Sequence, residues 1–204
     1  MAAPILRIDH VSVAVQDRQK AEHFFRYILG AVPGTSSTDP VMKYSWEIFS
    51  LGDLSRIEIL GATSRGSFLD GFLEKRVGGV HHITLQTSDI EETKALLYRH
   101  NIPYFGANEY AGVLWKEIFI HPRHAFGVLI QIAEFHPEDW LSDHARISGN
   151  RKWEVQQAGE GVQVELAHPG GGKMTLTLTR EEARRLAREL TEACEKPFPA
   201  QDRK

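Results

Sequence analysis

The chain has little of what several large classes of protein require. Its single cysteine, Cys194, cannot form an internal disulfide, and no apolar run approaches the roughly 20 residues that cross a bilayer. With 24 Lys and Arg against 27 Asp and Glu, the net charge of −3 provides no basic field for nucleic acid or an anionic membrane. The first residues lack the charged segment and apolar core of a secretory leader. We therefore expect a cytoplasmic protein that binds small molecules and forms a homodimer.

What the chain does contain is an ordinary globular composition and an internal repeat. Its 204 residues are 42% hydrophobic and 25% charged, which is enough for one sizeable domain or two small ones. Residues 8–17 match residues 80–89, which lie 72 positions later, and both segments alternate like a strand before ending in an Asp. A repeat of this length predicts one structural unit that occurs twice.

Each copy continues with the pattern of a helix. Apolar residues at helical spacing follow Asp17 as far as Gly30, and a second such pattern follows Asp89 and ends before Pro103. We expect each Asp to cap its helix, because a side-chain oxygen at that position accepts a hydrogen bond from a free backbone N–H.

Strand patterns follow the two helices. Residues 45–49 match residues 115–119 at an offset of 70, and residues 57–60 match residues 130–133 at an offset of 73. The weakest strand of each copy is expected around Val41 in the first and around Tyr104 in the second. The small change in offset indicates loops that differ by a few residues.

These patterns predict an α+β fold in which two βαβββ modules form a curled mixed sheet around a metal site, followed by a small C-terminal β-meander and helix. Alternating strands are expected at 153–157, 162–167 and 174–179, and Thr179 to Glu182 form a capping box that opens the helix. The expected boundaries are 5–61 and 78–135 for the modules, 67–76 for a connecting helix, 77–79 for a hinge, 136–151 for a linker, 152–197 for the extension and 198–204 for a tail.

Two histidines occupy equivalent strand positions in the repeat. Because side chains at i and i+2 share a face, His10 lies with Ser12 and Ala14, and His82 lies with Thr84. The opposite face of the first strand carries valines and is expected to face the core. A single histidine in a strand is usually structural, but the repetition favours metal binding. His81 points to the other face and is expected to be structural.

The last strand of each module adds one polar residue among isoleucines, Glu58 in the first module and Gln131 in the second. A charge inside an apolar strand needs a partner such as a metal, because burial without one costs several kcal/mol. We therefore expect His10, Glu58, His82 and Gln131 to bind one divalent ion. Two imidazoles, a carboxylate and an amide oxygen suit Zn, Ni, Co, Mn or Fe.

Residues 5–135 resemble the vicinal oxygen chelate superfamily of glyoxalases, epimerases, dioxygenases and antibiotic-resistance proteins. Within it the chain is most similar to the methylmalonyl-CoA epimerases. Two sequence segments carry the similarity: Gly79-Val80-His81-His82-Ile83, and His121-Pro122 followed by Gly127-Val128-Leu129-Ile130. The resemblance implies the same four metal ligands.

The resemblance also implies catalytic residues, with one departure. The epimerases carry Gln where this chain has Glu58 and Glu where it has Gln131, so the carboxylate and the amide have exchanged modules. The other epimerase base matches Glu47, which the repeat pairs with Glu117. If the roles have exchanged with the residues, Glu58 and Glu117 are the two bases, and Glu47 is the alternative to Glu117.

The expected reaction is removal of a proton next to a carbonyl, by an isomerase or epimerase, or by a lyase of the glyoxalase I type. An acyl-CoA or a glutathione adduct is the expected substrate. Two alternatives stay open. An Fe(II) dioxygenase would use His10, His82 and Glu58, and a resistance-type protein would bind a small molecule without catalysis.

Overall fold

The computed structural model describes residues 5–51, 55–110, 115–136, 147, 151–168 and 172–195. The chain divides into two compact units, residues 1–136 and 137–204. No helix among the described residues is long and apolar enough to cross a membrane.

The first unit contains eight strands, with α1 and α3 following the first strand of each half. Its elements are β1 (Ile5–Val15), α1 (Arg18–Glu22), the π-helix η1 (His23–Ile28), β2 (Val32–Asp39), β3 (Tyr44–Ser50), β4 (Arg56–Ala62), α2 (Leu69–Leu73), β5 (Gly78–Thr87), α3 (Ile90–Arg99), β6 (Phe105–Tyr110), β7 (Trp115–Ile120), the 3-10 helix η2 (Pro122–His124) and β8 (Ile130–Phe135).

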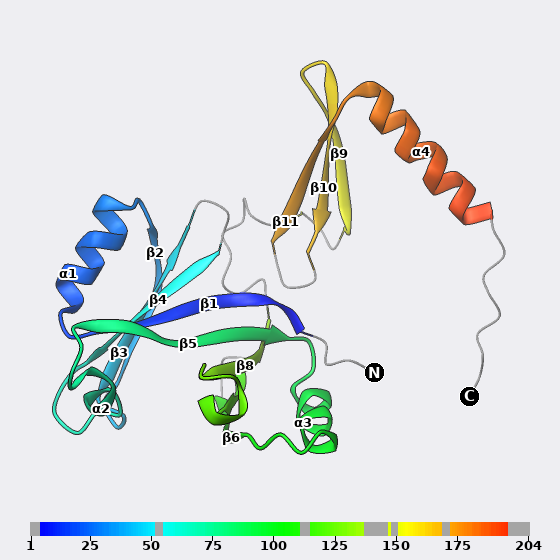
Figure 1. Ribbon diagram of the computed structural model, residues 1–204. Helices are drawn as coiled ribbons and strands as arrows, with labels where there is room; N and C mark the ends of the chain where they lie inside the picture. Colours follow the sequence, from blue (N-terminus) through cyan, green and yellow to red (C-terminus); the bar gives the residue numbers. More distant parts are fainter. Residues whose placement is uncertain are drawn as a thin grey trace. The chain divides into compact units, whose positions relative to one another are not determined.

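The eight strands form one sheet in the order β2-β3-β4-β1-β5-β8-β7-β6. Both halves are built alike, because β1 pairs in parallel with β4 and β5 pairs in parallel with β8. At the centre β1 and β5 run antiparallel to each other (Figure 1). The predicted α+β fold of two βαβββ modules is therefore confirmed.

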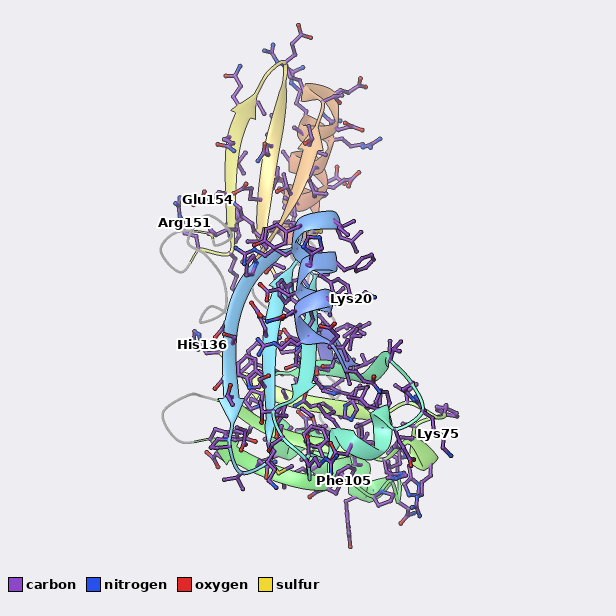
Figure 2. All side chains as sticks on the ribbon, turned by 90° about the vertical axis from the view of Figure 1, so that its left-hand side faces the viewer. Lys20, Lys75, Phe105, His136, Arg151 and Glu154 are labelled. Atoms are coloured by element: carbon purple, nitrogen blue, oxygen red, sulfur yellow. The ribbon has the colours of Figure 1, made fainter. Side chains whose placement is uncertain are left out.

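The two predicted helix starts are present. The Asp17 carboxylate accepts a hydrogen bond from the backbone N–H of Lys20 at 2.9 Å, and Asp89 accepts one from Glu92 at 2.8 Å. Lys20 itself lies on the exposed side of α1 (Figure 2). The first helix differs from the expected pattern in one respect, since it continues from His23 as a π-helix.

One face of the sheet packs under these helices. In the first half Phe49 and Ile59 pack with Phe25 of η1. In the second half Ile118 and Ile132 are buried together with residues of α3. These two clusters lie on the helix side of the sheet, whereas the other face carries the polar residues and a third apolar cluster around Leu60.

The valine face of β1 does pack on a core cluster, since Val15 contacts the cluster of Phe49 and Ile59, but it is not the more buried face. Its valines, expected to face the core, are only half-buried, whereas His10, Ser12 and Ala14 are buried. The reason is that side chains from both modules meet on the histidine face, where Ser12 contacts Glu58 and His82. The polar face is therefore the more deeply enclosed one.

Three local features differ from what the sequence predicts. Val41 lies in a turn, because the first module's edge strand is the polar segment β2, which gives no apolar alternation. The connecting helix is shorter than predicted, at Leu69–Leu73. The expected hinge contains the start of β5, where a Cβ on Gly78 would lie 2.9 Å from the Ala14 carbonyl oxygen. Only glycine lets β1 and β5 approach so closely at this point.

Among its described residues, the second unit has a three-stranded sheet in the order β11-β10-β9, followed by a helix. Its elements are β9 (Trp153–Ala158), β10 (Gly161–Ala167), β11 (Lys173–Leu178) and α4 (Arg180–Glu195). The predicted capping box is formed, since Thr179 Oγ1 accepts from the Glu182 N–H and the Glu182 carboxylate accepts from the Thr179 N–H. Arg151 and Glu154 form an ion pair at the start of β9 (Figure 2).

Candidate metal centre

The four predicted ligands lie on the four central strands of the sheet. His10 is on β1, Glu58 on β4, His82 on β5 and Gln131 on β8, and all four are buried. Strand register explains why they converge, because Ser12 of β1 stands opposite both Glu58 and His82.

Three of the ligands come close enough to share an ion. The Nε2 atoms of His10 and His82 lie 3.6 Å and 3.7 Å from Glu58 Oε2. Zinc bonds of 2.0–2.2 Å in tetrahedral geometry place neighbouring donor atoms about 3.4 Å apart. The donor types and spacing therefore fit a divalent ion. In the part of the chain that the structure describes, these three residues form the one cluster of His, Cys, Asp and Glu with this property.

Two hydroxyl groups connect the ligands across the modules. Ser12 Oγ donates to Glu58 Oε2 and lies 2.8 Å from His82 Nε2. The equivalent hydroxyl of the second module, Thr84 Oγ1, donates to Gln131 Oε1 at 2.5 Å and lies 2.9 Å from His10 Nε2. Each hydroxyl thus holds the polar ligand of its own module and the imidazole of the other. The sequence carried a signal for this pair, because two hydroxyl residues recur 72 positions apart on the histidine face.

Asp9 holds His10 from the outside of the site. Its Oδ2 atom lies 2.8 Å from His10 Nδ1, while Oδ1 accepts hydrogen bonds from Arg7 and Arg56. Burial opposes ionisation of Asp9, but the hydrogen bond with His10 and the charge of Arg56 lower its pKa to about 2. Burial likewise opposes protonation of His10, yet the charge of Glu58 and the contact with Asp9 raise its pKa to about 9. An ionised Asp9 orients the ring so that Nε2 faces the site.

His82 has a different outer partner. Its Nδ1 atom lies 2.9 Å from Nδ1 of His81, the residue that occupies the position equivalent to Asp9. Burial lowers the pKa of His82 to about 3, although the charge of Glu58 and a hydrogen bond with Gln131 act in the opposite direction. His81 packs against Phe68 and Phe72. These contacts agree with the predicted structural role of His81. Burial keeps the ring of His82 neutral, which is the form that binds a metal.

Glu58 stays ionised in this setting. Burial alone would raise its pKa, but the charge and hydrogen bond of His10 and the hydrogen bond from Ser12 lower it below the usual range. A buried carboxylate held charged between two imidazoles can bind a cation or accept a proton from a substrate.

Glu117 lies on the same face as the ligands but is surrounded by donors. Its carboxylate accepts hydrogen bonds from Asn108, Tyr110, Trp115 and Gln131, and the residue is 7% exposed. An ionised carboxylate has about four acceptor sites, and all of them are used here. These contacts argue against the predicted role of Glu117 as a base, because accepting a proton would require one of them to break.

Glu47 is placed on the wrong face for catalysis at this site. It stands opposite Ile59, whose side chain packs under η1, and its carboxylate forms a 3.0 Å ion pair with Arg18 of α1. The sequence match that paired it with Glu117 was shifted by one residue. In the structure, Glu117 faces Ala133 as Trp46 faces Leu60, so Trp46 is its true counterpart. A shift of one residue exchanges the two faces of a strand.

The sequence did not single out Tyr44 or Asp39, which belong to the same face. Burial and the charges of Glu58, Glu117 and Asp39 raise the pKa of the Tyr44 phenol. Burial, together with the charge of Glu117, raises the pKa of Tyr110 to about 12. Both phenols therefore remain neutral donors. Asp39 ends β2, a strand with no recognisable match in the other module, so the repeat offered no signal for it.

A model of the family described as the glyoxalase/bleomycin resistance protein/dioxygenase superfamily matches residues 9–119. The chain belongs to this superfamily. The resemblance expected from the sequence is thus confirmed, and the paired modules around a buried His-Glu-His cluster agree with it.

Epimerases are among the most similar members of the superfamily. Mitochondrial methylmalonyl-CoA epimerase of Homo sapiens is 32% identical over 130 residues, which cover 63% of this chain and 73% of that protein. The ethylmalonyl-CoA/methylmalonyl-CoA epimerase of Cereibacter sphaeroides is 31% identical over 131 residues, covering 63% of this chain and 97% of its own. The crystal structure of the epimerase from Mycobacterium tuberculosis has a TM-score of 0.61 at 23% identity, covering 67% of this chain and 93% of that one.

These relatives confirm the enzyme class expected from the sequence, an isomerase or epimerase. The chemistry of the cluster agrees with the expected divalent ion. Its carboxylate comes from the first module, as the sequence showed.

Proposed function

We propose that this enzyme is a metal-dependent epimerase of a short branched acyl-CoA, and that it removes the proton between the thioester carbonyl and a second carbonyl group. The observation that supports this most directly is the buried convergence of His10, Glu58 and His82 on the central strands. The substrate class comes from the relatives, which are named for methylmalonyl-CoA and ethylmalonyl-CoA.

His10, Glu58, His82 and Gln131 would hold the ion. A divalent ion bound there would polarise a substrate carbonyl and stabilise the negative charge that develops on its oxygen. Nitrogen and oxygen donors of this kind suit Zn, Ni, Co, Mn or Fe, and metal analysis of protein purified without added ions identifies which is bound.

The residues of the chain supply the rest of the chemistry. Glu58 is the carboxylate nearest the two imidazoles, and it is held ionised, so it is the group that takes the proton. Epimerisation is complete when a proton returns to the same carbon from the opposite side, for which a neutral phenol, Tyr44 or Tyr110, is the candidate donor, and both groups then recover their protonation states by exchange with solvent. Tyr44 and Tyr110, both kept protonated, can donate hydrogen bonds to an anionic substrate on the same face. The enclosed position of the site limits water around the carbanion.

The test compares Glu58→Gln with Glu47→Gln in deuterium exchange from solvent into methylmalonyl-CoA. Loss of a general base typically lowers a rate by about 10²- to 10⁴-fold, and we expect a loss of this size for Glu58→Gln. Glu47→Gln is the matched control, because Glu47 faces α1, and its rate should equal that of the wild-type enzyme. Equal exchange by wild-type and Glu58→Gln enzyme would exclude Glu58 as the base.

One observation favours a second candidate. Two histidines and one carboxylate are also the donors of non-haem Fe(II) oxygenases, and His10, His82 and Glu58 supply them. Iron in the purified protein together with oxygen uptake in the presence of a catechol would identify such an enzyme. A glutathione adduct as substrate and the homodimer expected from the sequence stay predictions.

A further inference from the structure

Glu117 accepts a hydrogen bond from Gln131, one of the proposed metal ligands. Its Oε1 atom accepts from Asn108 at 3.0 Å and from Tyr110 at 3.1 Å. Its Oε2 atom accepts from Trp115 Nε1 at 2.8 Å and from Gln131 Nε2 at 2.6 Å. The shortest of the four contacts is the one to Gln131. Four donors hold this buried carboxylate in one place.

The orientation of the Gln131 amide follows from this contact. An ionised carboxylate only accepts hydrogen bonds, so the amide must present its NH₂ group to Glu117. The amide oxygen then points the other way, where it accepts from Thr84 Oγ1 at 2.5 Å. Thr84 in turn lies 2.9 Å from Nε2 of His10. The oxygen atom, which is the atom of an amide that binds divalent ions, therefore faces the proposed metal ligands.

We propose that Glu117 is a positioning residue that fixes the Gln131 amide so that its oxygen atom, and not its nitrogen, enters the metal site. This inference rests on the metal site proposed above. It gives Glu117 a role through Gln131 and no role in proton transfer.

The difference between the two modules supports the proposal. The two oxygens of the Glu58 carboxylate are chemically equivalent. The first module therefore needs no residue that determines which of them faces the metal site. The position equivalent to Glu117 in that module is Trp46, which packs in the apolar cluster around Leu60. An amide has one oxygen and one NH₂ group, and the acceptor that distinguishes them is present only in the second module.

The proposal also explains why a carboxylate does not suit position 131. A Glu there would bring a second carboxylate to the place where the amide nitrogen now lies 2.6 Å from Glu117. Two like charges at that distance in a buried site repel each other strongly. The amide of Gln131 and the carboxylate of Glu117 form a matched pair of donor and acceptor.

The first test measures zinc affinity by competition with a chromophoric chelator. Removing an outer partner of a metal ligand typically weakens binding by about 10- to 100-fold, and we expect this for Glu117→Gln. The matched control is Asn108→Ala, which removes a different donor from the same carboxylate and leaves the contact with Gln131 in place. Its affinity should fall much less. Equal zinc affinity of wild-type and Glu117→Gln protein would overturn the proposal.

Two further variants test the matching of donor and acceptor. Gln131→Glu should bind zinc more weakly than wild type because it faces Glu117, and the double variant Gln131→Glu with Glu117→Gln should recover part of the loss. Absence of recovery in a double variant that folds, as judged by circular dichroism, counts against the orientation argument.

Activity at saturating zinc separates positioning from proton transfer. A positioning role predicts that Glu117→Gln regains most of its deuterium exchange when the site is filled, whereas a base would leave the rate low at any zinc concentration. A readout without metal is the ¹⁵N spectrum of the Gln131 side-chain amide, assigned by its loss in Gln131→Ala. We expect Glu117→Gln to shift this signal, and an unchanged signal would refute the contact. Failure of wild-type protein to bind zinc would instead refute the proposed metal site.

Discussion

The proton on His10 leads to a quantitative prediction about metal binding. His10 is hydrogen-bonded to Asp9 through Nδ1, and Glu58 lies 3.6 Å from its Nε2 atom, so the pKa of the ring in metal-free protein is raised to about 9. A metal can bind Nε2 only after that atom has lost its proton. Metal and proton therefore compete for His10, whereas His82, with a pKa of about 3, is already neutral.

The size of the effect on zinc affinity follows from the difference between the pKa of His10 and the pH of the assay. At pH 7 the pH is about two units below the pKa of the His10 ring. Deprotonation therefore costs about 3 kcal/mol and weakens the apparent affinity for zinc by roughly 100-fold. Between pH 7 and 9 the apparent affinity for zinc should rise about tenfold for each unit of pH, and above pH 9 it should level off.

The assay is chelator competition across this range, combined with calorimetry in two buffers of different ionisation enthalpy. We expect about one proton to be released per zinc ion at pH 7 and almost none at pH 10. Asp9→Asn removes the anionic partner of His10, so it should lower the pKa of the ring and move the change of slope to lower pH. Affinity that is constant between pH 7 and 9, with no proton release, would refute the reasoning.

Three other results are expected. The pKa of His10 rises from 6.5 in the unfolded chain to about 9, so this group stabilises metal-free protein by about 3 kcal/mol below pH 6.5. The contribution is lost as the pH rises through 9, and the difference in unfolding free energy between pH 6 and pH 10, measured with urea, reports it. Ile118→Ala should cost about 2–5 kcal/mol in the same assay, because the side chain is fully buried under α3. Asp89→Ala removes the cap of α3 and should cost about 1 kcal/mol, seen as a lower Tm.

Two independent patterns in the sequence agreed on the four candidate ligands. The repeat related His10 to His82, and the alternation of β4 and β8 placed one polar residue among isoleucines in each. Strand period, face and repeat position are all local properties of the text, and the parallel pairing of β1 with β4 then brings the residues together.

The prediction for Glu47 was wrong because text similarity and strand register diverged. The letters Glu-Ile-Phe occur in both β3 and β7, but in the structure Glu58 stands opposite Ile48, whereas Gln131 stands opposite Phe119. The loop between the two strands differs in length between the modules, and one residue is enough to turn a side chain to the helix side. Register depends on pairing between strands, which the sequence of one strand does not reveal.

The partners of the ligands were not predictable for a related reason. Asp9 is adjacent to His10 in the sequence, but its function depends on Arg56, which comes from β4, and on the burial of both. In the same way nothing in the text connects Glu117 to Gln131 until β7 and β8 pair. Such contacts arise from tertiary structure and not from local pattern.

The candidate metal site is surrounded by several charged residues whose roles differ. Asp9 is neutralised by Arg7 and Arg56, so its charge is not available to a bound cation. The negative charges left beside a divalent ion are those of Glu58, which would bind it directly, and Glu117, which acts through the amide of Gln131. Burial of a charge is tolerated when opposite charge is nearby, so a divalent ion beside Glu58 would offset the charge of that buried carboxylate. Exchanging Glu and Gln between the modules leaves the summed charge of the ligands unchanged, and what it adds is an amide whose NH₂ group needs the acceptor that Glu117 provides.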